Sequence, residues 1–205
     1  MKLIVVTAPE NKPEDAQHIQ ELFIAGLESL HLRKPDLSQN DFEKIVKQLP
    51  PSLYKKIVIH SHYKLIEKYN LKGIHLTAWF MREAGLSEVK KIITTAHQRR
   101  LSVSGSFHSI EDLENLQLKL DYVFLGPVFD SISKEGYNAK ININDAAVFL
   151  QKRKGFEVFA IGGISKNNIN NIKTAGFDGA VLLGSIWNGE DPSDNFKEIQ
   201  KQITA

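Results

Sequence analysis

The sequence predicts an α/β fold, a (β/α)8 barrel of the TIM type, from two observations. Eight strand-like segments alternate with helix-like segments along the chain, and the last two strands each stop at glycine. Strict alternation of strands and helices favours a parallel sheet. The 205 residues lie at the short end of the roughly 200 to 400 that such barrels use. We therefore expect one domain, residues 1–205, with short loops.

Short apolar runs that end at glycine or at polar residues predict the strands. In chain order they are Leu3–Thr7, Ser29–Arg33, Ile57–His60, Gly73–Leu76, Leu101–Ser104, Tyr122–Leu125, Val158–Ile161 and Ala180–Leu183.

Segments with apolar residues at helical spacing predict the helices between these strands. They are Pro13–Leu27, Gln39–Leu49, Tyr63–Tyr69, Leu86–Arg99, Ser109–Leu116, Ile143–Lys152, Lys166–Ala175 and Pro192–Ile203. Ser109 followed by Asp112 resembles a capping box, and Gly85 is expected where a helix ends.

Composition and charge exclude several classes of protein. The formal charge is +2, from 26 basic and 24 acidic residues, so neither nucleic acid nor a membrane surface is an expected partner. The absence of cysteine excludes disulfides, thiolate metal sites and a cysteine nucleophile. No apolar run reaches the ~18 residues of a membrane span, so we expect a soluble cytoplasmic protein. The composition leaves a homodimer open.

The two glycine-ended strands near the C-terminus predict a phosphate site. The runs Ala160–Ile164 and Asp178–Ile186 each stop at glycine just before a stretch that can begin a helix. Exposed backbone N–H groups at such a point attract phosphate, and glycine permits a close approach. The alternative is that these glycines only end strands.

Histidines gather where the predicted strands end. His31, His60, His62, His75 and His108, five of the seven histidines, follow or end strands two to five. Active sites of TIM barrels lie at that rim, although any one of these rings could instead be hydrogen-bonded in the interior. His60 and His62 share one side of an extended backbone, but two ligands are too few, and we expect no metal site here.

A hydroxyl-rich loop follows strand six. Ser131 and Ser133 precede Lys134, so hydroxyl donors and a cation could trap an anion, and Arg33 can face them across the barrel mouth. A solvated surface loop is the alternative. Together with the glycine-ended strands, these residues predict a ligand with phosphate at one end and further negative charge at the other.

Motifs along nearly the whole chain resemble thiamine-phosphate synthase (thiamine-phosphate pyrophosphorylase) and its relative TenI. They are Leu32-Arg33, Gly73-Ile74-His75-Leu76, Ser106-Phe107-His108-Ser109, Gly126-Pro127-Val128-Phe129, Ser131-Ile132-Ser133-Lys134, Ala160-Ile161-Gly162-Gly163-Ile164 and Asp178-Gly179. The resemblance implies a reaction that joins thiazole phosphate to a pyrimidine-methyl diphosphate with loss of pyrophosphate, assisted by Mg²⁺. It also implies that thiazole phosphate contacts Ser131, Ser133, Gly163, Leu183 and Gly184, and that the diphosphate meets Arg33, Ser106 and Lys134, with Lys134 as a catalytic residue.

The chain departs from the synthase pattern at the metal site. His31 stands where synthases typically carry glutamine, His60-Ser61 replaces Asn-Asp, and Thr77 to Phe80 replaces the segment with the second acidic ligand. Magnesium prefers oxygen ligands, so we expect it as a cofactor only if synthase activity is retained.

TenI shares the histidine at position 31 and the missing carboxylates, and that branch implies a thiazole tautomerase. Its catalytic histidine, however, corresponds to Pro127, so another acid or base is needed, and we expect His31 or His62, with His60 as a further site residue. Three readings stay open: a synthase or tautomerase of thiamine biosynthesis, a non-catalytic binder of a phosphorylated thiazole, and another phosphate-binding barrel such as a sugar-phosphate isomerase.

Overall fold

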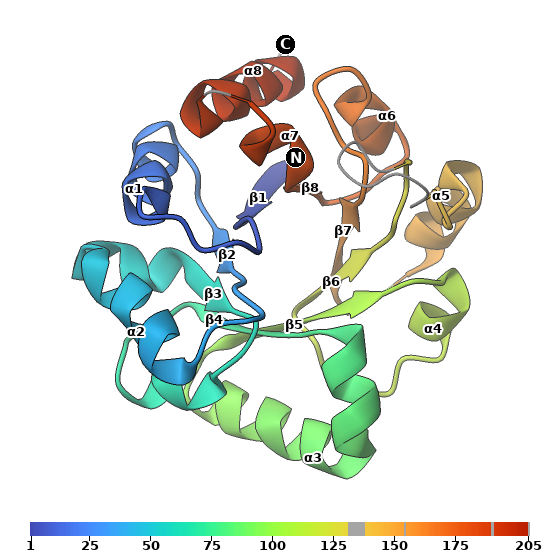
Figure 1. The fold of residues 1–205 in the computed structure, drawn as a ribbon. Coiled ribbons are helices and arrows are strands. Elements are labelled where there is room, and N and C mark those ends of the chain that lie inside the picture. The colour runs from blue at the N-terminus through green and yellow to red at the C-terminus, as the bar shows by residue number, and fades with distance from the viewer. Residues whose placement is uncertain (131–137, 154, 190, 205) are drawn as a thin grey trace.

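Eight parallel strands close into a barrel in the order β1 to β8, with β8 paired to β1. The structure is a computed structural model that describes residues 1–130, 138–153, 155–189 and 191–204. Figure 1 shows the strands gathered at the centre and the helices arranged around them. The predicted fold class, an α/β barrel of the TIM type, is confirmed.

Each predicted strand is present, with bounds close to those expected. The strands are β1 (Lys2–Val6), β2 (Leu30–Leu32), β3 (Ile57–Ile59), β4 (Gly73–Leu76), β5 (Ser102–Phe107), β6 (Tyr122–Leu125), β7 (Glu157–Ile161) and β8 (Gly179–Leu182).

The helices surround this sheet. They are α1 (Asp15–Ile24), α2 (Gln39–Gln48), α3 (Ala78–Gln98), α4 (Ile110–Glu114), α5 (Ile143–Lys152), α6 (Ile169–Thr174), α7 (Gly184–Trp187) and α8 (Pro192–Thr204), with 3₁₀ turns η1 (Pro51–Lys56) and η2 (Tyr63–Glu67). In the described part of the chain, no helix is both long enough and apolar enough to cross a membrane.

Two helix predictions need correction. The segment expected to be an α-helix at Tyr63–Tyr69 is the shorter 3₁₀ turn η2. The helix expected from Leu86 begins at Ala78, because the Thr77 hydroxyl accepts a hydrogen bond from the Phe80 N–H at 3.1 Å and caps it. Gly85 then interrupts α3 with φ +73°, so a glycine expected at a helix end lies at a kink between two helical segments.

A hydroxyl cap also starts α4, as the sequence predicts. Ser109 Oγ accepts a hydrogen bond from the Asp112 N–H at 3.1 Å. A cap of this kind contributes about 1 kcal/mol. It fixes the point at which the chain leaves the barrel rim after β5.

The core has two layers because strand side chains alternate between the two faces of the sheet. Outward-facing residues of the strands pack against the helices in the larger cluster. The smaller cluster fills one side of the barrel interior with apolar and aromatic side chains, namely Ile4, Val6, Tyr122, Phe124, Phe159 and Val181. The other side of the interior, from β2 to β5, contains buried polar residues, among them His31, His75 and Ser104.

Candidate functional site

A cavity of about 390 Å³ opens where the strands end, at the rim that carries the active site in TIM barrels. Over the described part of the chain its lining contains Arg33 but no carboxylate. The lining residues are Val6, Arg33, His60, Thr77, Ala78, Trp79, Ser106, Phe107, His108, Phe124, Gly126, Pro127, Ile161, Gly162, Gly163, Ile164, Val181, Leu183, Gly184 and Ser185.

A second hollow of about 560 Å³ lies outside the barrel rim, between α3 and α4. It shares Ala78, Ser106, Phe107 and His108 with the first cavity, and its remaining wall comes from helix and loop side chains such as Met81 and Leu116. Because the strand ends converge on the smaller cavity, we place the candidate site there.

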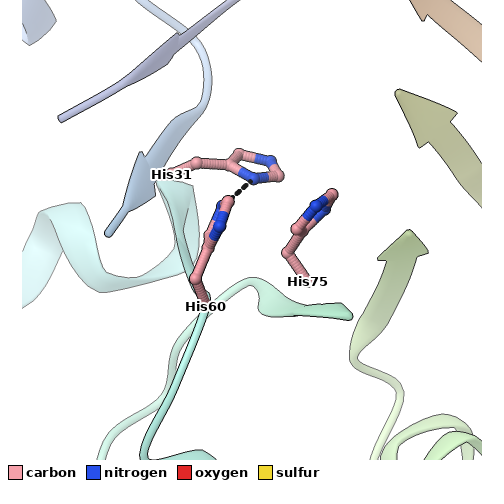
Figure 2. A group of neighbouring side chains, drawn as sticks. All are labelled: His31, His60 and His75. Carbon is pink, nitrogen blue, oxygen red and sulfur yellow. Dashed lines mark hydrogen bonds between the residues drawn. The ribbon is translucent and has the colours of Figure 1, made fainter. Parts of the chain in front are cut away.

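Three histidines from neighbouring strands meet at the wall of the first cavity, which we call the central cavity. His31 comes from β2, His60 follows β3 and His75 comes from β4, and each has a ring nitrogen within 4.8 Å of such a nitrogen on the others. His31 Nδ1 lies 2.9 Å from His60 Nε2. The His60 and His75 rings stack with centroids 4.2 Å apart, while the His31 ring meets His60 edge-on, as Figure 2 shows. We call His31, His60 and His75 the histidine cluster.

Hydroxyl groups of β5 and β6 fix two of these rings. His31 Nε2 lies 2.8 Å from the Tyr122 hydroxyl. His75 Nδ1 lies 2.8 Å from Ser104 Oγ, and His75 Nε2 lies 2.7 Å from Ser106 Oγ. His60 lines the cavity, and its buried Nδ1 has no partner among the described residues.

Burial keeps the histidine cluster uncharged. Desolvation lowers the pKa of His31 and of His60 well below the usual range, and repulsion from the neighbouring rings lowers both further. The same desolvation, followed by repulsion from Arg33, lowers the pKa of His75 to about 3. The rings are therefore neutral imidazoles near pH 7, and each has one nitrogen lone pair to offer.

Arg33 is held at the cavity by its backbone. Thr7 Oγ1 donates to the Arg33 carbonyl and accepts from the Arg33 N–H, both at 2.9 Å. The next residue, Lys34, turns away from the cavity: its Nζ lies 2.6 Å from Asp15 Oδ2 and also donates to the Glu10 carbonyl. With 0 % of its side chain exposed, Lys34 is a structural residue, and Arg33 supplies the charge at the site.

The structure gives a different reason for two glycines of the predicted phosphate site. Gly162 and Gly163 have φ values of +101° and +64°, a region that favours glycine. A Cβ on Gly162 would lie 2.6 Å from the Pro127 side chain, and one on Gly163 would lie 2.2 Å from the Asp130 carbonyl oxygen. These glycines therefore let β7 turn against the segment that follows β6.

Backbone donors nevertheless line this part of the cavity. Gly163, Gly184 and Ser185 line it, and their N–H groups have no partner among the described residues. The Ser185 hydroxyl is buried and likewise unpartnered in that part of the chain. Unpaired N–H donors at a strand end form a concave anion site. We call Gly163, Gly184 and Ser185 the donor rim.

His108 offers a ring nitrogen to the same cavity. Its Nδ1 donates to the Gly126 carbonyl oxygen at 2.8 Å, which fixes the proton on Nδ1. Nε2 is then the unprotonated nitrogen of the neutral ring. His108 lines the cavity and is exposed, so this nitrogen can meet a ligand without the cost of burying a charge.

The structure brings together part of the set of residues predicted from the sequence. Arg33, His60, Ser106, Gly163, Leu183 and Gly184 line the cavity, and His31 lies behind His60. His62 instead points to the Leu37 carbonyl at 3.0 Å and contacts the Phe42 ring, away from the lining. Ser131, Ser133 and Lys134 lie outside the described residues.

Sequence reasoning missed Tyr122, Ser104, Trp79 and Ser185. The period-two alternation of β5 and β6 could have found two of them, since Ser104 shares a strand face with Ser106, and Tyr122 with Phe124. Ser185 lies within the run Asp178–Ile186 and Trp79 within the segment from Thr77 to Phe80, both of which the sequence singles out, but neither residue has a predicted role of its own.

Comparisons with known proteins agree with the resemblance seen in the sequence. The family model described as thiamine monophosphate synthase matches residues 3–186. A thiamine phosphate pyrophosphorylase structure from Bacteroides thetaiotaomicron is 33% identical, with a TM-score of 0.78 over 100% of this chain and 98% of that one. One from Pyrococcus furiosus, at 22% identity, has a TM-score of 0.80 over 99% of this chain and 95% of that one.

A curated relative named thiamine-phosphate synthase, from Prochlorococcus marinus, is 26% identical over 98% of this chain. The chain spans 56% of the length of that relative.

Proposed function

The chain belongs to the thiamine monophosphate synthase family, and we propose that it binds a phosphorylated thiazole in the central cavity and transfers a proton on it, as a thiazole tautomerase. One observation carries the proposal: a histidine with a fixed, unprotonated Nε2 and a rim of unpartnered backbone donors line the same cavity, which has no carboxylate among its described residues.

The donor rim suits the phosphate group of such a ligand. Three N–H groups, at Gly163, Gly184 and Ser185, have no other described partner, and Arg33 supplies a positive charge in the same cavity. Hydrogen bonds to a phosphate are strengthened by its charge. The heteroaromatic ring would then lie toward Phe124 and Trp79, both of which line the cavity.

The proton transfer needs one group that can take a proton from the ring and return it at another position. We assign this role to His108, because Nδ1 donates to the Gly126 carbonyl, so Nε2 is the nitrogen left to exchange a proton with a ligand, and that carbonyl stabilises the imidazolium formed when Nε2 accepts the proton. His31 and His62, the first expectations from the sequence, are less suited: His31 is fully buried, and His62 lies off the lining.

Solvent deuterium exchange into a thiazole phosphate, or conversion of its tautomer, followed by NMR, tests this assignment. We expect His108→Gln to slow the reaction by ~10²–10⁴-fold while thiazole phosphate still binds. His18→Gln, a histidine remote from the cavity lining, is the matched control. Loss of exchange in His62→Gln but not in His108→Gln would contradict the assignment.

Synthase activity is the second candidate, favoured by the names of the similar proteins and by Arg33 in the cavity. Turnover of thiazole phosphate with pyrimidine-methyl diphosphate and Mg²⁺, abolished in Lys134→Ala, would establish it in place of the tautomerase. Tight binding of thiazole phosphate with neither reaction would leave a non-catalytic binder.

A further inference from the structure

The described donor set does not fit magnesium, the ion that the family resemblance implies. Magnesium demands oxygen ligands in near-octahedral geometry and is usually bound through carboxylates. Over the described residues the cavity offers no carboxylate, and the group of side chains close enough to share an ion consists of three imidazoles. No step of the proposed proton transfer uses a metal.

We propose that His31, His60 and His75 form a binding site for a nitrogen-preferring divalent metal ion such as Zn²⁺. Three histidines and one open position make a known tetrahedral arrangement for zinc. Here the three rings come from consecutive strands β2, β3 and β4, so the sheet itself holds their spacing.

The distance between the histidine nitrogens allows an ion to bind after a small movement of the rings. Zinc binds histidine nitrogen at about 2.0–2.1 Å, so two ligand nitrogens of a tetrahedral site lie ~3.4 Å apart. His31 Nδ1 and His60 Nε2 are 2.9 Å apart and joined by a hydrogen bond. An ion between them replaces that shared proton and separates the rings by about half an ångström.

Supporting hydrogen bonds already orient two of the ligands. A metal-bound imidazole normally donates its other N–H to a neighbouring acceptor. His31 would bind through Nδ1 and donate from Nε2 to the Tyr122 hydroxyl, and His75 would bind through Nε2 and donate from Nδ1 to Ser104 Oγ. Ser106 Oγ, which contacts His75 Nε2, is the one hydroxyl that has to yield.

The contacts within the cluster also favour a metal. An ion there displaces the proton that His31 and His60 share and the contact of Ser106 with His75. Arg33, the nearby cation, would draw an anion or hydroxide to the open position and so balance the charge of the ion.

Metal-free protein titrated with Zn²⁺ or Co²⁺ by calorimetry tests the site without any substrate. We expect one equivalent per chain, intense visible absorption of the Co²⁺ form typical of tetrahedral nitrogen ligation, and no competition from Mg²⁺. Tyr122→Phe removes a supporting hydrogen-bond partner and should weaken metal binding by ~10–100-fold. His60→Gln removes a ligand and should weaken it by more. His62→Gln, on the same strand end but outside the cluster, should bind as the unmodified protein does.

Three results would overturn the proposal: no stoichiometric Zn²⁺ or Co²⁺ binding, equal binding in His60→Gln and the unmodified protein, or displacement by Mg²⁺. Circular dichroism of each variant separates loss of ligands from loss of folding, and Tyr122→Phe preserves all three imidazoles. Proton transfer is assayed separately, so failure of the metal site leaves the role of His108 standing.

Discussion

The two sides of the barrel mouth bind by different means. On the side formed by β2 to β5, side chains do the work: Arg33, the histidine cluster and His108 offer charge and lone pairs. On the side formed by β7 and β8, the donor rim offers backbone N–H groups, and apart from the Ser185 hydroxyl the side chains around it are apolar. Substitution of a single side chain can therefore remove a function on the first side. On the second side it acts mainly by disturbing the backbone.

The two sides also differ in what stabilises them. The turn after β7 depends on positive φ angles and close backbone contacts that allow no Cβ. The histidine side depends on burying polar rings whose nitrogens are hydrogen-bonded, apart from His60 Nδ1, because an unpaired buried polar group costs about 1–3 kcal/mol. The stability of the β7 side therefore depends on backbone conformation, and that of the histidine side depends on the protonation of its rings.

Gly163→Ala should give the largest effect. Its Cβ would lie 2.2 Å from the Asp130 carbonyl at φ +64°, whereas Gly176 has φ +87° with nothing within 4 Å of a Cβ. We expect Gly176→Ala to cost ~1–2 kcal/mol from backbone strain alone, and Gly163→Ala to cost ~1–3 kcal/mol more from the clash. Urea unfolding of both variants measures the difference.

Equal losses of stability in the two alanine variants would mean that the backbone at Asp130 moves away from the added Cβ at little cost. The β7 side would then not be held by close backbone contacts, and the contrast between the two sides would fail. Retained binding of inorganic phosphate in Gly163→Ala would contradict the role of the donor rim.

Acidification should weaken the histidine side next. The pKa values of His31, His60 and His75 are lowered in the folded protein, so the unfolded chain binds more protons below about pH 6.5. The stability of the metal-free protein should then fall as the pH drops from about 6.5 toward 3, by up to ~1.4 kcal/mol per pH unit for each ring. Urea unfolding at several pH values, with a chelator present, measures the slope.

His75→Gln provides the control for this slope, because it removes one titrating ring and keeps a polar side chain. A shallower slope is expected. An unchanged slope would show that acid sensitivity arises elsewhere in the molecule.

Trp79→Ala should have the smallest effect on stability. The indole is 64% exposed, although it lines the cavity, so the free energy of unfolding should change by no more than ~0.5 kcal/mol. Binding of thiazole phosphate should weaken, because the ring would lose an aromatic neighbour. Calorimetry with thiazole phosphate and with inorganic phosphate separates the ring from the phosphate, since only the former should be affected.

Much of this arrangement could be predicted from the sequence, because period-two alternation and glycine-ended runs report directly on strands. The gathering of His31, His60 and His75 at one rim follows from their positions at the ends of strands two to four. Their mutual contacts do not follow, since these depend on the stagger of neighbouring strands, and His62 turns away although it is only two residues from His60. The homodimer and the cytoplasmic location stay predictions.

The turn at Gly162 and Gly163 shows what a sequence motif cannot predict. Gly162 and Gly163 were predicted from their place at a strand end, yet their conformation is set by contacts with Pro127 and Asp130. Such contacts join segments about 35 residues apart in the sequence, so they cannot be predicted from the local composition.

The interruption of α3 at Gly85 has a mechanical consequence. A continuous helix of 21 residues would have one axis, so the direction of one end would fix the direction of the other. The glycine divides it into two segments with separate tasks: the one from Ala78 to Ala84 rests Phe80, Met81 and Ala84 on the edge of the core and carries Trp79 to the cavity mouth, while the one with Val89, Ile93 and Ala96 packs on the core itself. The direction of the segment at the mouth is thus set independently of the helix that covers the outer wall of the barrel.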